Sequence, residues 1–274
     1  MFRLLATDID GTLLGPDGSL PSQNIVALRA LHDAGITIVF CSGRSDISIR
    51  GIAAPILPPA DDAYYIAFNG ARIVTAGSRQ MLSHRYVTPP AIRQVVHYAR
   101  EHGLYIQGYR DDIFLVEKKT DFTDRYAHDT QTRYEVVPDL IEALPHGSPK
   151  LFFAATHEQL VPHRTQLLAM GEIDSPDGFT AMFSKPHYLE VIGWMVNKGD
   201  ALAELAGTLG VPIGETLAVG DGDNDTDMIR AAGTGVAVNG SSAGATQAAD
   251  QVLTSRAEDG VMKEVAERFF GLRA

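Results

Sequence analysis

Residues 4–14 read LLATDIDGTLL, so an apolar run ends in two aspartates, Asp8 and Asp10, with a glycine directly after them. Two like unit charges about 4 Å apart repel by roughly 4 kcal/mol at a surface-like dielectric. A second acidic run, DGDNDTD from Asp221, follows another apolar stretch, ETLAVG. A hard divalent cation neutralises such carboxylates, and Mg2+ is the usual ion where a phosphate completes the coordination shell. The two runs therefore predict a magnesium site.

A carboxylate beside that ion could attack phosphorus and form an aspartyl-phosphate, which divides one hard step into two easier ones. A second carboxyl group two residues along could protonate the departing alkoxide and later deprotonate water. A serine hydroxyl and a lysine ammonium could hold the oxygens of the phosphoryl group in transfer, while Mg2+ neutralises charge in the transition state. The sequence offers Ser42 and Lys198 for these two tasks.

Other motifs that bind metals or nucleotides do not fit the chain. Counted as a calcium loop, DGDNDTD has Thr226 where the sixth position needs glycine and Ala232 where the twelfth needs glutamate, so we exclude an EF-hand. No GxxxxGK[ST] sequence is present, and no GxGxxG follows the first expected strand. A P-loop and a dinucleotide-binding fold therefore have little support.

The elements that must position these residues alternate between strand and helix patterns. The apolar runs 2–7 and 36–41 flank a helical pattern at 22–35, and 63–68 and 216–220 have the pattern of further strands. This order favours a parallel sheet with right-handed crossovers. In open parallel sheets, ligands bind beyond the carboxyl ends of the strands. The polar loops at Asp8–Asp10, Ser42–Arg44, Asn69–Gly70 and Asp221–Asp225 should therefore share one edge.

The middle of the chain has a different pattern, with adjacent short strands between helices. We expect an inserted α+β domain at 84–187 and a core domain formed by 1–83 and 188–274. The expected fold class is α/β, with a Rossmann-like parallel-sheet core and an inserted α+β cap. An insert of this size could close over the site, exclude water and select the leaving group.

The charge and composition of the chain limit the binding partners and the cellular location that we expect. The formal net charge of −11 argues against a nucleic-acid partner, which would need a basic face. We found no apolar run of about 18 residues or more, so no membrane span is expected, and Arg3 and Asp8 interrupt any signal peptide. The single cysteine, Cys41, excludes an internal disulfide. We expect a cytoplasmic monomer or small homo-oligomer.

Four segments in order resemble the motifs of haloacid-dehalogenase-like (HAD) phosphatases: DIDGTLL at 8–14, FCSGR at 40–44, NKG at 197–199 and GDGDND at 220–225. The resemblance is closest to the Cof-like subgroup, which carries a type IIB cap between the second and third motifs. FNGA at 68–71 and KPHYLEVI at 185–192 are also similar to that subgroup. Serine at position 42 replaces the threonine common in the family and keeps its hydroxyl.

The resemblance implies roles by position. It makes Asp8 the nucleophile and Asp10 the general acid/base. It implies substrate-binding roles for Ser42, Gly43, Lys198 and Asn224, and a supporting role for Asp225 in orienting Lys198 or a metal-bound water. The implied Mg2+ ligands are Asp8, Asp10 through its main-chain carbonyl, and Asp221.

These features predict a Mg2+-dependent phosphatase of small phosphorylated metabolites, with sugar phosphates as the expected class. A phosphomutase that passes the phosphoryl group to a sugar stays open as an alternative. A phospho-accepting signalling module also uses an aspartate, Mg2+, a hydroxyl and a lysine, but it would be shorter. The aspartate two residues after Asp8 favours turnover over storage of the phosphoryl group.

Overall fold

The structure is a computed structural model that describes residues 1–130, 132–171 and 175–272. The chain forms two compact units, one from Met1–Ser83 with Asn197–Ala274 and the other from His84–Val196. The second unit extends beyond the expected boundary at residue 187. Strand β11 (Tyr188–Gly193) pairs with β10 (Phe179–Lys185) and β9 (Leu151–Ala154), so a boundary at 187 would separate it from both partners.

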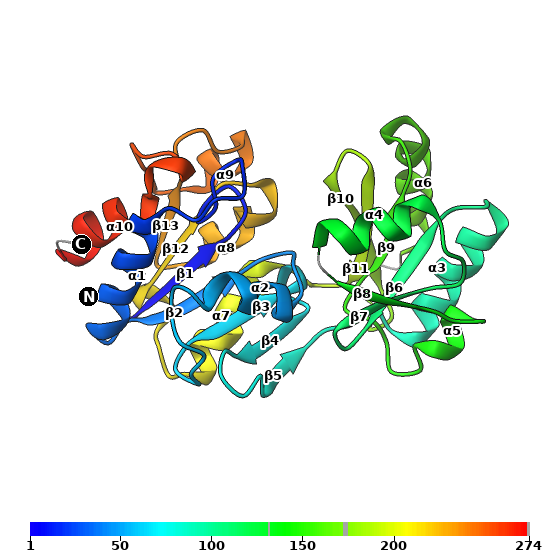
Figure 1. Cartoon of the computed structure of the whole chain (residues 1–274), viewed down its shortest axis with the longest axis horizontal. Coiled ribbons are helices and arrows are strands. Elements are labelled where there is room, and N and C mark those ends of the chain that lie inside the picture. The colour runs from blue at the N-terminus through cyan, green and yellow to red at the C-terminus, as the bar shows by residue number, and fades with distance from the viewer. Residues whose placement is uncertain (131, 172–174, 273–274) are drawn as a thin grey trace. The chain divides into compact units, whose positions relative to one another are not determined.

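The first unit is built on an eight-stranded sheet in the order β14-β13-β12-β1-β2-β3-β4-β5 (Figure 1). The strands from β14 to β3 are parallel, as the strand and helix order predicts, and β4 runs antiparallel to β3. The central strands are buried on both faces, which explains their continuous apolar sequences. The strands are β1 Leu4–Asp8, β2 Thr37–Cys41, β3 Tyr64–Ala67, β4 Arg72–Thr75, β5 Met81–His84, β12 Thr216–Gly220, β13 Thr234–Ala237 and β14 Gln251–Val252.

Six α-helices are described in this unit: α1 Ser22–Asp33, α2 Asp46–Ala53, α7 Lys198–Thr208, α8 Thr226–Ala231, α9 Ala243–Ala248 and α10 Val261–Phe270. Leu202 and Leu205 of α7 and Met228 of α8 share one buried cluster with Val39 and Ile66 of the sheet. This packing fixes the first turn of α7 and the loop before α8 relative to the strand ends. Over the described parts of both units, none of the helices has the length and apolar character needed to span a bilayer.

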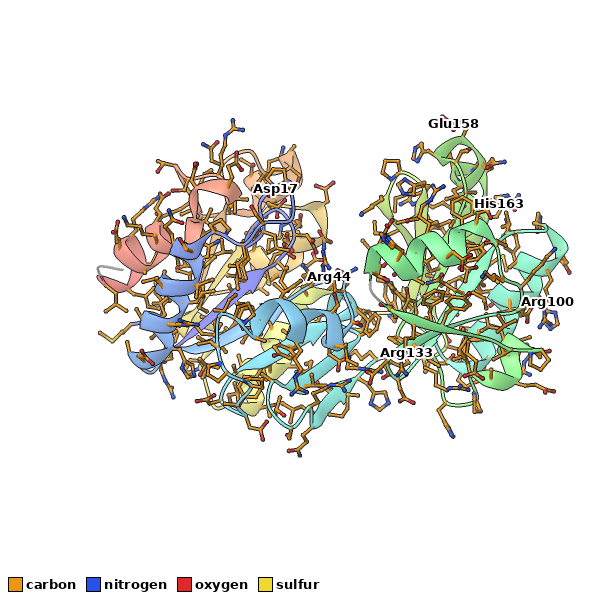
Figure 2. All side chains as sticks on the ribbon, viewed as in Figure 1. Asp17, Arg44, Arg100, Arg133, Glu158 and His163 are labelled. Carbon is orange, nitrogen blue, oxygen red and sulfur yellow. The ribbon has the colours of Figure 1, made fainter. Side chains whose placement is uncertain are left out.

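The second unit has a six-stranded sheet in the order β10-β11-β9-β6-β7-β8, antiparallel except between β7 and β8. Its core packs apolar residues of α3 and α6 against the sheet, among them Ile92, Val95 and Leu160. Arg100, labelled in Figure 2, lies in the last turn of α3 and forms ion pairs with Glu117 and Asp139. The remaining elements are α3 Pro89–Glu101, β6 Ile106–Arg110, β7 Ile113–Val116, α4 Asp121–Thr130, β8 Arg133–Val136, α5 Leu140–Ala143 and α6 His157–Met170.

Glu264 of α10 ties this helix to the segment before it, and its loss should lower stability. The carboxylate accepts hydrogen bonds from the backbone N–H groups of Thr254 and Ser255 and pairs with Arg268. Partial burial raises the pKa of Glu264, but the hydrogen bonds outweigh this and lower the pKa from 4.5 to about 2. A lowered pKa stabilises the fold above about pH 4.5, and that stabilisation disappears as the pH falls towards 2.

Glu264→Gln should therefore lower the free energy of unfolding by about 1–2 kcal/mol at neutral pH, after allowance for the group's partial exposure. The difference from the unmodified protein should shrink as the pH falls below about 4. Urea denaturation at several pH values measures both quantities. Glu267→Gln, an exposed position on the same helix, is the matched control. Equal stability of Glu264→Gln and Glu267→Gln at neutral pH would contradict this account.

Candidate active site

The site lies at the carboxyl ends of four neighbouring strands of the first unit, in the order β12-β1-β2-β3. Asp8 is the last residue of β1, Asp221 follows β12, Ser42 follows β2 and Asn69 follows β3. Parallel pairing places these ends side by side, with Thr7 opposite Val219 and Asp8 opposite Cys41. The predicted shared edge is therefore confirmed, and Asp221 lies beside the end of β1.

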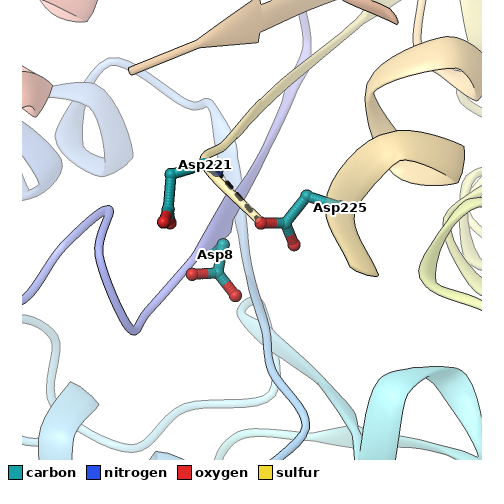
Figure 3. A group of neighbouring side chains, drawn as sticks. All are labelled: Asp8, Asp221 and Asp225. Atoms are coloured by element: carbon teal, nitrogen blue, oxygen red, sulfur yellow. Dashed lines mark hydrogen bonds between the residues drawn. The ribbon is translucent and has the colours of Figure 1, made fainter. Parts of the chain in front are cut away.

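Three carboxylates converge at this edge. Asp8, Asp221 and Asp225 each offer an oxygen, and these oxygens all lie within 4.8 Å of one another (Figure 3). Thr12 donates a hydrogen bond from Oγ1 to Asp221 Oδ1 at 2.8 Å, across 209 residues of sequence. Gly11 makes the close approach possible, because a Cβ at that position would lie 2.3 Å from Asp221 Oδ2. Its φ of +88° also favours glycine.

Lys198 supplies the positive charge of this cluster. It is the first residue of α7, where Asn197 caps the helix by accepting a hydrogen bond from the backbone N–H of Asp200. Its side chain is fully buried, and Nζ donates to Asp8 Oδ1 at 2.5 Å and to Asp225 Oδ1 at 2.6 Å. Burial alone would lower the pKa of Lys198, but attraction to the two carboxylates raises it above the ordinary value. The ammonium therefore keeps its charge.

Asp225 holds the site together through both of its oxygens. Besides the bond from Lys198, its Oδ2 accepts hydrogen bonds from the backbone N–H groups of Asp221 at 3.0 Å and Gly222 at 2.9 Å, the first of which Figure 3 shows as a dashed line. Asp8 and Asp221 each accept through Oδ1 alone among the described residues. A cation would thus find the Oδ2 atoms of Asp8 and Asp221 available, whereas Asp225 positions Lys198 and the loop.

The electrostatics of the cluster fit a bound divalent cation. Burial raises the pKa of Asp8 well above its ordinary value, the charge of Asp225 raises it further, and Lys198 opposes both effects. Burial likewise raises the pKa of Asp221 to about 6, against the hydrogen bond from Thr12. One lysine cannot balance three buried or half-buried carboxylates. A hard cation held by carboxylate oxygens would supply the missing charge.

Asp10 lies outside this cluster. Its carboxylate is 53% exposed and forms a two-pronged ion pair with Arg44, from Nε to Oδ2 at 2.7 Å and from Nη2 to Oδ1 at 2.6 Å. Arg44 is labelled in Figure 2. Its backbone N–H donates to Ser42 Oγ at 3.2 Å, which fixes the buried serine hydroxyl at the end of β2. The predicted acid/base and the predicted hydroxyl are therefore joined through one arginine.

The structure adds two residues that the sequence interpretation gave no role. Thr12 supports Asp221, and Asn69 accepts a hydrogen bond through Oδ1 from Asn224 Nδ2 at 3.2 Å. Thr12 belongs to the quoted DIDGTLL segment, and Asn69 lies two residues after the end of β3. Both positions were thus available as polar residues at strand ends, but their partners are far away in sequence.

Known proteins resemble this chain over most of its length. The family model described as haloacid dehalogenase-like hydrolase matches residues 5–265. A relative named HMP-PP phosphatase, from Enterobacter sp. (strain 638), is 32% identical over 237 residues, which cover 86% of this chain and 84% of the relative.

Solved structures share the fold along nearly the whole chain. A haloacid dehalogenase-like hydrolase from Bacteroides thetaiotaomicron matches with a TM-score of 0.88 and 24% identity, over 98% of this chain and all of that one. A HAD subclass IIB sugar phosphatase matches with a TM-score of 0.76 and 22% identity, over 98% of this chain and 99% of that one. The chain therefore belongs to the haloacid dehalogenase-like hydrolase family.

Proposed function

We propose that the protein is a Mg2+-dependent phosphatase that hydrolyses small phosphorylated metabolites, with sugar phosphates as the first class to test, through an aspartyl-phosphate on Asp8. The observation that carries the proposal is the buried cluster in which Asp8 meets Asp221, Asp225 and Lys198 at one sheet edge. The net charge of −11 repels an anionic substrate. The protein therefore needs a local cation, Lys198 or a bound Mg2+, to attract one.

In the first step, Asp8 attacks the phosphorus of the monoester, and the bond from phosphorus to the leaving oxygen breaks. Asp10 gives its proton to that oxygen, so an alcohol leaves and an aspartyl-phosphate remains. In the second step, Asp10 takes a proton from water, whose oxygen attacks phosphorus, and Asp8 is released with inorganic phosphate. In the structure the Asp10 carboxylate is paired with Arg44, so this pair must open before Asp10 can carry the proton of the first step.

The other residues of the site hold the phosphoryl group. Lys198 and the Ser42 hydroxyl would bind its oxygens, and Gly43 and Asn224 lie on the neighbouring loops. Asp8, Asp221 and the main-chain carbonyl of Asp10 would hold Mg2+, which would neutralise charge that builds up on the transferring group. Asp225 would act indirectly, by keeping Lys198 in place.

The substrate class is proposed from the relatives. The relatives named above are a phosphatase of HMP-PP and a sugar phosphatase. We further propose that His84–Val196 acts as the cap, and that the enzyme is cytoplasmic and monomeric or a small homo-oligomer. A screen of phosphorylated metabolites with Mg2+, ranked by kcat/KM, tests the class. Phosphate released to water supports hydrolysis, whereas transfer to a second sugar would make the protein a phosphomutase.

Affinity for Mg2+ should fall as the pH drops below about 6. Burial raises the pKa values of Asp8 and Asp221, the latter to about 6, so below that pH a proton occupies a carboxylate that the metal needs. Each displaced proton lowers the apparent affinity by up to about tenfold per pH unit. Isothermal titration of the protein with Mg2+ at about pH 5 and about pH 7.5 measures the change.

Asp221→Asn is the matched variant for this titration. It should bind Mg2+ weakly at both pH values, because the amide is a poorer ligand than a carboxylate and carries no titratable proton. An unmodified protein that binds Mg2+ equally well at both pH values would be inconsistent with the raised pKa of Asp221. Chelation of Mg2+ should abolish turnover at either pH.

A further inference from the structure

The turn that follows β3 has an unusual backbone. Phe68, Asn69 and Gly70 have φ values of 52°, 57° and 105°, so three successive residues lie in the left-handed region. Only the third is a glycine, and the first two are buried. Non-glycine residues pay a steric cost for this conformation, and such costs gather at functional sites, where the surroundings hold the strained residue in place.

Backbone hydrogen bonds tie this turn to the loop after β2. Phe68 donates its N–H to the carbonyl oxygen of Arg44 at 2.9 Å, and Asn69 donates its N–H to that of Ser42, also at 2.9 Å. Ser42 in turn donates its N–H to the carbonyl oxygen of Ile66. The strained turn therefore sets the path of the loop that carries the Ser42 hydroxyl, and straightening it would break these bonds.

The Asn69 side chain reaches the loop after β12 as well. It is 5% exposed, and its Oδ1 accepts the hydrogen bond from Asn224. Its amide also lies against Gly43, because a Cβ at that glycine would stand 3.2 Å from both Asn69 Oδ1 and Nδ2. The Asn69 side chain thus fills the space between the loop after β2 and the loop after β12. It contacts one residue proposed to bind substrate in each loop, Gly43 in the first and Asn224 in the second.

We propose that Asn69 is a positioning residue for phosphoryl transfer. Its side chain fixes the positions of Asn224 and the Gly43 backbone relative to each other. The inference rests on the phosphatase function proposed above. Asparagine suits the position for two reasons. It tolerates the left-handed conformation better than most side chains, and it accepts the bond from Asn224 without adding another negative charge beside Asp8, Asp221 and Asp225.

Two variants separate the side chain from the backbone. Asn69→Gly keeps the left-handed turn, which glycine adopts readily, and removes the amide, so it should still fold. Its kcat/KM should fall about tenfold, the effect of losing one ordering hydrogen bond. Asn69→Asp keeps the shape and the acceptor for Asn224 but adds charge, so the rise in KM should exceed the fall in kcat. Asp111→Gly, an exposed left-handed position at the tip of the β6–β7 hairpin, is the backbone control and should keep full activity.

A double-variant cycle then tests whether Asn69 acts through its partner. If it does, Asn69→Gly should cost little in a protein that already carries Asn224→Ala, because the bond is already lost. Losses that simply multiply, or an Asn69→Gly variant with unchanged kcat/KM, overturn the inference. Turnover by the unmodified protein is measured in the same assay, so an inactive parent refutes the proposed function, whereas an active parent with insensitive Asn69 variants refutes only this inference.

Discussion

Asp8→Asn should abolish turnover of phosphate monoesters and leave the fold intact. The amide cannot attack phosphorus, and loss of a covalent nucleophile typically costs about 10^4-fold or more in kcat. Stability should not fall, because ionised Asp8 is buried beside Asp221 and Asp225, and burial already raises its pKa. Removing that charge leaves Lys198 paired with Asp225. Phosphate release with p-nitrophenyl phosphate and a thermal melt measure both effects.

Two further variants make this result specific. Asp33→Asn, an exposed aspartate at the end of α1, should retain full activity. Asp10→Asn should also turn over slowly, but for another reason: p-nitrophenolate can leave without a proton, so the first step proceeds, whereas without the base for the second step a phosphorylated protein should accumulate. Mass spectrometry after rapid acid quench would show one added phosphoryl group. Residual turnover in Asp8→Asn close to that of the parent would falsify the assignment of the nucleophile.

Lys198→Met should cost both activity and stability, in contrast to Asp8→Asn. The ammonium is fully buried between Asp8 and Asp225, and without it two buried carboxylates face each other with no counter-charge. Breaking a buried pair in this way typically costs about 3–5 kcal/mol. The phosphoryl group would also lose a cation, so kcat should fall by about 10^2-fold or more.

Denaturant melts and steady-state kinetics check the Lys198 prediction. Lys263→Met, at an exposed position of α10, applies the same chemical change to a solvated side chain and should alter neither quantity. Mg2+ should stabilise Lys198→Met more than it stabilises the parent, because the ion then becomes the only cation of the cluster. A Lys198→Met protein as stable as Lys263→Met would show that the buried ion pair contributes little.

The sequence was sufficient for the central strands and the long amphipathic helices, because their apolar periodicity is strong. It did not indicate β8, whose residues are mostly exposed, or α4, in which Thr123 is the only buried residue. Strand β4 also escaped prediction, and its antiparallel pairing with β3 depends on the strained turn at Phe68–Gly70. Short or solvated elements such as these are held by tertiary contacts, which have no local pattern.

The features of the site likewise divide into those that the sequence predicts and those that depend on tertiary contacts. Because the carboxyl ends of parallel strands must meet at one edge, Asp8, Ser42 and Asp221 could be placed together from sequence alone. The two-pronged pair between Asp10 and Arg44 and the contact between Asn69 and Asn224 could not. Each depends on side-chain directions in loops, and a loop's direction follows from packing between distant segments. The residue types indicated which chemistry to expect, whereas the contacts that orient the side chains are visible only in the structure.

The pairing of β1 with β12 has a consequence for biosynthesis. A ribosome synthesises β1 first, but the strand that lies beside it emerges only after about two hundred further residues, roughly 10 to 40 seconds later. During that interval one edge of β1 has no partner, and the nascent chain lacks both Lys198 and Asp221. The cluster of Asp8, Lys198 and Asp221 therefore forms only after β12 and the loop behind it have been synthesised, and chaperones that shield unpaired strand edges should bind this protein mainly during its translation.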